Sequence, residues 1–253
     1  MKPFWSLVSL TIKTTLNRRL LWSIVAVSVL VTAAIVLFAN MSLDQTARLA
    51  ADFSLAATIL VTIITSIIIT ANSVLAEQDR GILLIMLPKP TSRATFLVAK
   101  YVGLLISTLV MYALVCAIVF GGVAIWQPLP WADIVLTALA SSLELVVLLS
   151  IATLAASFTT PILATLVTLS LFITGHVLSL IVYATSQSPA VIRWIAQAIY
   201  YLLPNLEKFN IREVYISAHT LSAGYYGWMI VYALVYATAT MLIATTIFNK
   251  REW

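Results

Sequence analysis

The chain has 253 residues, of which 62% are hydrophobic and only 9% are charged. Soluble globular domains carry about 25% charged residues, so the composition excludes an ordinary soluble domain and predicts a membrane protein. The formal net charge of +5 comes from Lys and Arg residues that flank apolar runs. This placement indicates membrane topology and attraction to a lipid surface, and it gives no reason to expect a nucleic-acid partner.

Residues 1–19 are predicted to form an amphipathic helix in the inner headgroup region. Apolar residues recur every four positions on one face, at Phe4, Val8, Ile12 and Leu16. Polar residues occupy another face, at Lys2, Ser6, Ser9, Lys13 and Asn17. The same pattern also fits a basic segment that only flanks the first membrane span. The apolar run that follows, 20–39, is longer than the roughly 7–15 apolar residues of a cleavable signal sequence, so we expect an uncleaved first span.

Six apolar runs are long enough to cross a bilayer, which takes about 20 residues. They cover about 20–39, 53–76, 101–126, 134–158, 161–184 and 225–248. These runs predict an all-α, polytopic membrane protein in which residues 1–253 form a single transmembrane domain. An even number of spans places both chain ends on the same side of the membrane.

The distribution of Lys and Arg predicts the orientation of the spans. Ten of these residues lie on one side, namely Lys2, Lys13, Arg18, Arg19, Arg80, Lys89, Arg93, Lys100, Lys250 and Arg251. Four lie on the other side, namely Arg48, Arg193, Lys208 and Arg212. Because cytoplasmic segments carry the excess of positive charge, we expect both termini and the segment 77–100 in the cytoplasm and the loop 185–224 outside. In that loop, an apolar stretch broken by Pro204 predicts two short helices before the last span.

The most informative segment lies between the second and third predicted spans, at 77–100, and reads EQDRGILLIMLPKPTSRATFLVAK. Gly81 can act as a hinge, and Pro88 and Pro90 prevent a continuous helix. A plain connection would need neither the apolar run 82–87 nor the Pro-x-Ser-Arg turn that restarts a helix. A partner is therefore predicted to dock here, on the candidate residues Glu77, Arg80, Gly81, Pro88, Pro90, Ser92, Arg93 and Lys100.

This segment resembles the first cytoplasmic loop of ABC-2 type permeases, the six-span membrane subunits of ATP-driven transporters. The residues that match the pattern of that family are Glu77, Arg80, Gly81, Pro90, Arg93 and Lys100, while Asp79 and Pro88 are mild departures from it. The six-span layout extends the resemblance over the whole chain. The sequence YLLPNL at 201–206 is also similar to permeases grouped with multi-copper-enzyme maturation.

The resemblance implies the permease subunit of a prokaryotic ABC transporter in the plasma membrane, and an exporter. It implies that 77–100 is a coupling helix with its flanks and that 1–19 is an elbow helix at the membrane surface. Two copies of a separate ATPase would hold the ATP and Mg²⁺, so no cofactor is expected on this chain. A second permease subunit, identical or similar, would complete the complex. The tight turn at 159–161 would form a smaller second contact with the ATPase, or it is a plain helical hairpin.

Glu144 and His176 stand out because they are ionisable and lie within the predicted spans. A charge near the middle of a bilayer costs about 2.5–3.5 kcal/mol or more, so Glu144 is expected to face the bundle interior or to be protonated, and His176 in the neighbouring span is a candidate partner. The sequence is consistent with three roles for these two residues. The pair would be a polar point in the translocation path or dimer seam, an interhelical hydrogen bond that holds two spans together, or a proton or ion site.

Other chemistry is missing from the sequence. It contains no G-x-x-x-x-G-K-[ST] for ATP binding and no H-E-x-x-H or G-x-S-x-G for hydrolysis, so we expect no enzyme activity in this chain. No metal-ligand cluster is predicted, and Cys116 is expected to be a small buried hydrophobe. Two other functions are open. One is an ATP-independent channel or secondary transporter that uses Glu144 and His176, and the other is a membrane assembly factor without transport.

Overall fold

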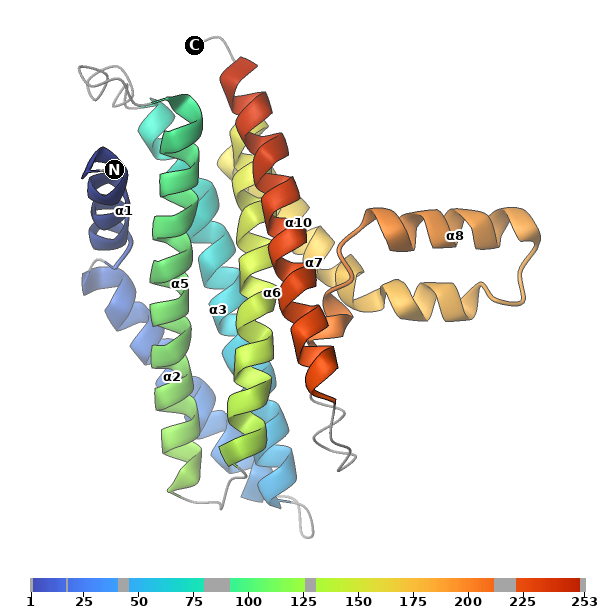
Figure 1. The fold of residues 1–253 in the computed structure, drawn as a ribbon. Coiled ribbons are helices and arrows are strands. Elements are labelled where there is room, and N and C mark those ends of the chain that lie inside the picture. Colours follow the sequence, from blue (N-terminus) through green and yellow to red (C-terminus); the bar gives the residue numbers. More distant parts are fainter. Residues whose placement is uncertain are drawn as a thin grey trace.

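The computed structural model describes residues 2–16, 18–40, 46–79, 92–125, 131–211 and 222–250. Within these ranges the chain is helical and has no strand, which confirms the all-α class (Figure 1). The helices are α1 (Lys2–Thr15), α2 (Arg18–Asn40), α3 (Thr46–Asp79), α5 (Arg93–Ala124), α6 (Trp131–Phe158), α7 (Pro161–Ala184), α8 (Ala190–Leu202), the short 3-10 helix η1 (Leu206–Phe209) and α10 (Ala223–Lys250).

Five helices among the described residues are long and apolar enough to cross a membrane. They are Asp52–Val74, Arg93–Ala124, Ile134–Phe158, Pro161–Ala184 and Gly224–Lys250. The run predicted as the first span lies in α2, whose described apolar segment, Ser23–Leu37, is shorter than the other five. The whole of α2 has 23 residues, which corresponds to about 35 Å at the rise of an α-helix. The chain is therefore a multi-pass membrane protein.

The centre of the bundle is α6, which packs against α3, α5, α7, α10 and η1. The largest group of buried side chains joins α6 to its neighbours, and it includes Ile67 of α3, Leu148 of α6 and Ala233 of α10. A second group, near the end where α10 finishes, includes Leu97 of α5 and Phe248 of α10. Figure 1 shows both termini toward the same end of the bundle.

The N-terminal helix α1 packs along α5, and a glycine makes this close approach possible. A Cβ atom added to Gly103 would lie only 2.7 Å from Cβ of Thr11. The buried face of α1 is formed by Val8, Thr11 and Thr15, whereas Trp5 is exposed. The predicted amphipathic helix is present. Its buried face includes Thr11 and Thr15 as well as Val8 of the predicted apolar stripe. The face is shifted toward Thr11 because this side chain packs against Gly103, which has no side chain of its own.

The first part of α7 runs alongside α3 and α6, whereas its last part projects sideways from the bundle and α8 folds back antiparallel to it (Figure 1). Of the described side chains of α8, Ala196 is the buried one. The chain then returns to the bundle through η1, where Leu206 fits against Gly175 of α7. The main-chain N–H of Asn205 donates to the hydroxyl of Tyr232 on α10 over 2.9 Å. In the described part of this loop, the short helices α8 and η1 precede α10, and Pro204 separates them, as the sequence predicted.

Candidate functional site

The predicted coupling segment 77–100 begins at the end of α3 and finishes inside α5. Arg80, Gly81, Pro88 and Pro90 lie outside the described residues, and Glu77 lies in α3 with a side chain that is also outside them. The described part therefore consists of Ser92, Arg93 and Lys100, which stand at the beginning of α5.

Ser92 is the N-cap of α5. Its backbone is extended, with φ −65° and ψ 148°, and its Oγ accepts a hydrogen bond from the N–H of Thr95 over 3.2 Å. A serine here satisfies one of the free N–H groups of the first helical turn, and its loss typically costs about 1 kcal/mol. The serine thus fixes where the span restarts after the segment 77–91.

Arg93 and Lys100 differ in what a partner could reach. Arg93, at the first position of α5, is exposed. The Lys100 residue is 3% exposed and lies beside Leu97 and Tyr101 on the buried side of α5. Arg93 can therefore contact a docked protein directly. Lys100 would act on coupling through the packing of α5.

The structure brings Glu144 and His176 together, although they lie on different helices, α6 and α7. The imidazole Nε2 of His176 lies 3.5 Å from Oε1 of Glu144. The Glu144 side chain is 3% exposed and that of His176 is 27% exposed. The two residues therefore form a polar contact between neighbouring spans, with the carboxylate inside the bundle and the imidazole at its edge.

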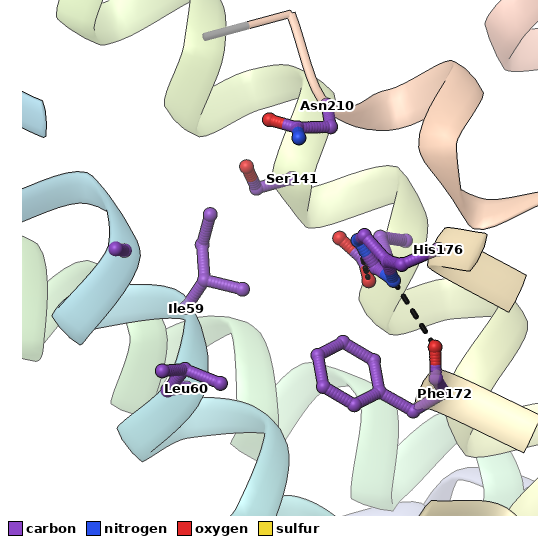
Figure 2. A pocket seen from close by; sticks show the side chains of 8 residues that line it. Ile59, Leu60, Ser141, Phe172, His176 and Asn210 are labelled. Atoms are coloured by element: carbon purple, nitrogen blue, oxygen red, sulfur yellow. Dashed lines mark hydrogen bonds and ion pairs between the residues drawn. The ribbon is translucent and has the colours of Figure 1, made fainter. Parts of the chain in front are cut away.

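The orientation of the imidazole is set by Phe172, one helical turn earlier on α7. The Nδ1 atom lies 3.1 Å from the carbonyl oxygen of Phe172, and the two rings meet edge to face with centroids 4.8 Å apart. A carbonyl oxygen can only accept a hydrogen bond, so Nδ1 carries a hydrogen. Figure 2 shows this contact between His176 and Phe172, and the opposite nitrogen, Nε2, is the one that lies near Glu144.

A pocket of about 140 Å³ adjoins this pair. It is lined by Ala56, Ile59 and Leu60 of α3, Ser141 and Glu144 of α6, Phe172 and His176 of α7, and Asn210 after η1. Figure 2 shows Ile59 and Leu60 on one side of the space, opposite Phe172 and His176. The hydroxyl of Ser141 donates to the carbonyl oxygen of Thr137 over 2.9 Å, so this serine offers lone pairs toward the pocket. One wall of the pocket is apolar and the other can bind or release protons.

The sequence predicted Glu144 and His176 but not the residues around them. Ser141 and Phe172 stand one helical turn before the two predicted residues, so helical spacing could have found both. Asn210 has no such signal because the chain must first leave the bundle through α8 and return through η1 before this residue reaches α6.

The tight turn between α6 and α7 has a simple construction. Thr159 donates its N–H to the carbonyl oxygen of Ala155 over 3.0 Å, and Pro161 is the first residue of α7, where its missing N–H does no harm. This geometry is that of a helical hairpin, and it is compatible with both predicted roles of the turn.

Cys116 lies in α5, partly buried beside Tyr112, as the sequence predicted for a small hydrophobe. Among the described residues, no group of His, Cys, Asp and Glu is placed to hold a metal ion.

A comparison with curated protein sequences finds no match for this chain. The family model described as ABC-2 family transporter protein matches residues 23–253, which include all the long spans, the segment 77–100 and the Glu144–His176 pair. The similarity to permeases grouped with multi-copper-enzyme maturation is finer than this match and stays a prediction. The chain therefore belongs to the ABC-2 transporter family, as a membrane permease subunit of an ABC transporter.

Proposed function

We propose that this chain is the permease subunit of an ATP-driven exporter in a prokaryotic plasma membrane, with both termini in the cytoplasm. The ATP and Mg²⁺ belong to a separate ATPase subunit, present in two copies, which docks on the segment 77–100. The family match and the lack of a phosphate-binding motif in the sequence support this division of labour.

The observation that carries the proposal is the course of α3. This helix ends at Asp79, next to the coupling segment, and carries Ile59 and Leu60 in the wall of the pocket. At 1.5 Å per residue, the 20 positions from Ile59 to Asp79 span about 30 Å along one continuous helix. A push at the coupling segment therefore reaches the pocket by rigid-body movement of α3, which is a common form of gating.

A second permease subunit, either a second copy or a similar chain, completes the complex. The exposed apolar side chains of α7 support this part of the proposal. They include Ile162, Leu166, Ile173 and Leu180, and they leave a large surface for a neighbouring subunit or for lipid. The mass of the purified complex in detergent, measured by light scattering with the detergent subtracted, tests for two permease chains.

The test of coupling is the double variant Arg80→Glu with Arg93→Glu. It should insert normally, because both residues lie outside the apolar core of the spans, but it should lose the ATPase because it reverses the charge of the docking surface. The readouts are recovery of a P-loop ATPase with the affinity-tagged permease and ATP turnover of the purified complex. Arg193→Glu on α8 is the matched control, and it should leave both unchanged. Unchanged recovery and turnover in the double variant would remove the coupling role of 77–100.

A secondary transporter is the alternative that one observation favours, namely the Glu144–His176 pair within the spans. Transport by the reconstituted protein separates the two functions. An ATP-driven permease moves its substrate only with the ATPase and ATP present. A secondary transporter works without them, in response to a proton or ion gradient.

A further inference from the structure

We propose that the pocket beside Glu144 and His176 binds a small organic cation and releases a proton as it does so. This assigns a substrate class to the pocket. Its part in transport rests on the proposed function, whereas binding itself rests on the geometry of the described residues. Three features carry the inference: the proton between the two side chains, the burial of the carboxylate, and the chemistry of the pocket wall.

A proton lies between Glu144 and His176. Because Nδ1 of His176 already donates to the carbonyl oxygen of Phe172, a neutral imidazole would turn the lone pair of Nε2 toward Oε1 of Glu144, 3.5 Å away. Two bare lone pairs repel each other at this distance. A single proton removes the repulsion, either on the imidazole or on the carboxyl group, and in both arrangements the pair is neutral.

The burial of Glu144 makes this proton exchangeable for another cation. The side chain is 3% exposed, so a carboxylate that loses the proton without compensation is strongly destabilised. A cation placed beside it restores the balance of charge.

The pocket wall fits a compact cation that carries alkyl groups. Ile59 and Leu60 supply apolar surface, and the ring of Phe172 can interact with a positive charge. The Ser141 oxygen can accept a hydrogen bond, since its hydrogen is directed at Thr137. None of the residues that line the pocket is Lys or Arg, so the described wall has no fixed positive charge with which to hold an anion.

The size of the pocket limits the ligand. About 140 Å³ is close to the volume of an engineered cavity that accepts benzene, about 150 Å³. A trimethylammonium group with a short chain fits this volume, whereas large multi-ring cations do not.

Other titratable groups lie on the elements that surround the pair. The phenol of Tyr112 on α5 interacts electrostatically with Glu144. Other titratable side chains on the elements packed around the pocket include Asp52 on α3, Cys116 on α5, Glu207 and Lys208 on η1, and Tyr226, Tyr232 and Tyr236 on α10. Of these, Glu207 and Lys208 are exposed, whereas the Glu144 side chain is buried against His176.

The binding step is balanced in charge and atoms. One cation enters the pocket and one proton leaves the Glu144–His176 pair for solvent, so the pocket has the same net charge before and after. No bond other than that to the proton is broken.

Binding is tested with the full chain in lipid nanodiscs, with choline as the probe and 3,3-dimethylbutan-1-ol as its uncharged analogue of the same shape. A quaternary ammonium has no proton of its own, so any proton released comes from the protein. Calorimetric titrations at pH 7 in phosphate and in Tris, which differ in heat of ionisation, count that proton. We expect about one proton released per choline bound, and binding of the alcohol about tenfold weaker or more with no release. Equal binding of the two compounds, no binding of choline, or binding without release overturns the proposal.

Two variants locate the exchange. Glu144→Gln should weaken choline binding about tenfold or more and abolish proton release, because the amide carries neither charge nor a labile proton. The exposed Glu207→Gln is the matched control and should bind like the wild type. If Glu144→Gln unfolds, Phe172→Leu takes its place, since it keeps the apolar wall but should lower the affinity for choline several-fold without changing that for the alcohol. A folded Glu144→Gln variant that still binds choline like the wild type or still releases a proton contradicts the cation site. So does a folded Phe172→Leu variant with unchanged affinity for choline.

The proposed function is tested separately from the pocket. Choline binding does not require the ATPase, so a protein that binds the cation but recovers no ATPase contradicts the proposed function alone. A complex that couples to its ATPase but does not bind choline contradicts the cation site alone.

Discussion

The neighbouring helices α6 and α7 are both apolar enough to cross a membrane, yet the structure uses them in opposite ways. Within the most apolar part of each helix, 61% of the residues of α6 are buried in the chain, compared with 17% of those of α7. The turn between them is only two residues long. Apolar composition therefore shows that a helix belongs in the bilayer, but it does not show whether the helix faces protein or something else.

The difference lies in the small and polar residues of the two helices. Six buried alanine, serine and threonine residues along the second half of α6 allow its neighbours to approach closely, namely Ser150, Ala152, Thr153, Ala155, Ala156 and Ser157. The hydroxyls among them bond to carbonyl oxygens of their own helix, for example Thr153 to Leu149 over 2.8 Å. In α7 the comparable positions form a narrow line, Ala164, Thr168, Gly175 and Leu178, and the rest of its surface stays uncovered.

Whether α7 crosses the membrane despite its small buried face has an all-or-none test. Ser188 lies in the turn between α7 and α8, at the tip of the sideways hairpin, and Ser92 precedes α5, which begins at the end of the bundle where α10 finishes (Figure 1). In a Cys116→Ala background, an impermeant thiol reagent added to intact cells should modify Ser188→Cys and not Ser92→Cys. Modification of Ser92→Cys would reverse the orientation inferred from the charges, and protection of both would place the end of α7 inside.

Shortening the same side chain on each helix should have unequal effects on stability. Leu148 of α6 is fully buried, whereas Leu166 of α7 is 55% exposed. Leu148→Ala should lower the free energy of unfolding by about 2–3 kcal/mol because it leaves a cavity. Leu166→Ala should change it by less than about 0.5 kcal/mol. Unfolding in mixed micelles with increasing SDS measures both. Equal losses would mean that α7 is as tightly packed as α6.

The narrow buried line of α7 should still be sensitive at Gly175. A Cβ there would lie 2.7 Å from Cγ of Leu206 and 2.8 Å from the carbonyl oxygen of Pro204, and the second contact involves backbone that cannot rotate away. Gly175→Ala should therefore cost about 1–2 kcal/mol of stability. Gly227→Ala on α10, which meets nothing within 4 Å, is the control and should be neutral or slightly stabilising. A Gly175→Ala variant with the same free energy of unfolding as the wild type would show that the contact with η1 does not hold α7 to the bundle.

The sequence predicted those parts of the fold that depend on local pattern. Unbroken apolar runs located the long helices, and Pro204 located the break between α8 and η1. Burial by a distant neighbour was harder to predict. Which face of α1 is buried depends on Gly103, which is far along the chain. Asn210 lines the pocket only because the chain leaves the bundle through α8 and returns through η1. The pairing of Glu144 with His176 was predictable because two polar groups in an apolar medium have few other partners.

A regular stripe of hydroxyl residues marks the buried side of α3. These residues recur every four positions, at Ser54, Thr58, Thr62, Ser66 and Thr70, and all of them are buried. This spacing places them on one face of the helix. Small side chains on such a face allow close helix packing in membranes. The spacing of these five residues is a local pattern, so it could have predicted which side of α3 faces the bundle.

The smallest expected effect on stability concerns the contact that joins α6 to α7. Glu144→Gln keeps an amide that can donate to Nε2 of His176, and intramembrane hydrogen bonds contribute about 0.6 kcal/mol on average, so the free energy of unfolding should fall by about that amount or less. The same SDS titration measures it, with Glu207→Gln as the matched control.

A loss above about 2 kcal/mol would identify the pair as the structural link between a buried helix and an exposed one. With the expected small loss, weaker choline binding in the same variant cannot be attributed to unfolding. The polar pair would then contribute little to holding the buried helix α6 against the exposed helix α7. Its role would be to bind the ligand in the pocket that α3, α6 and α7 line.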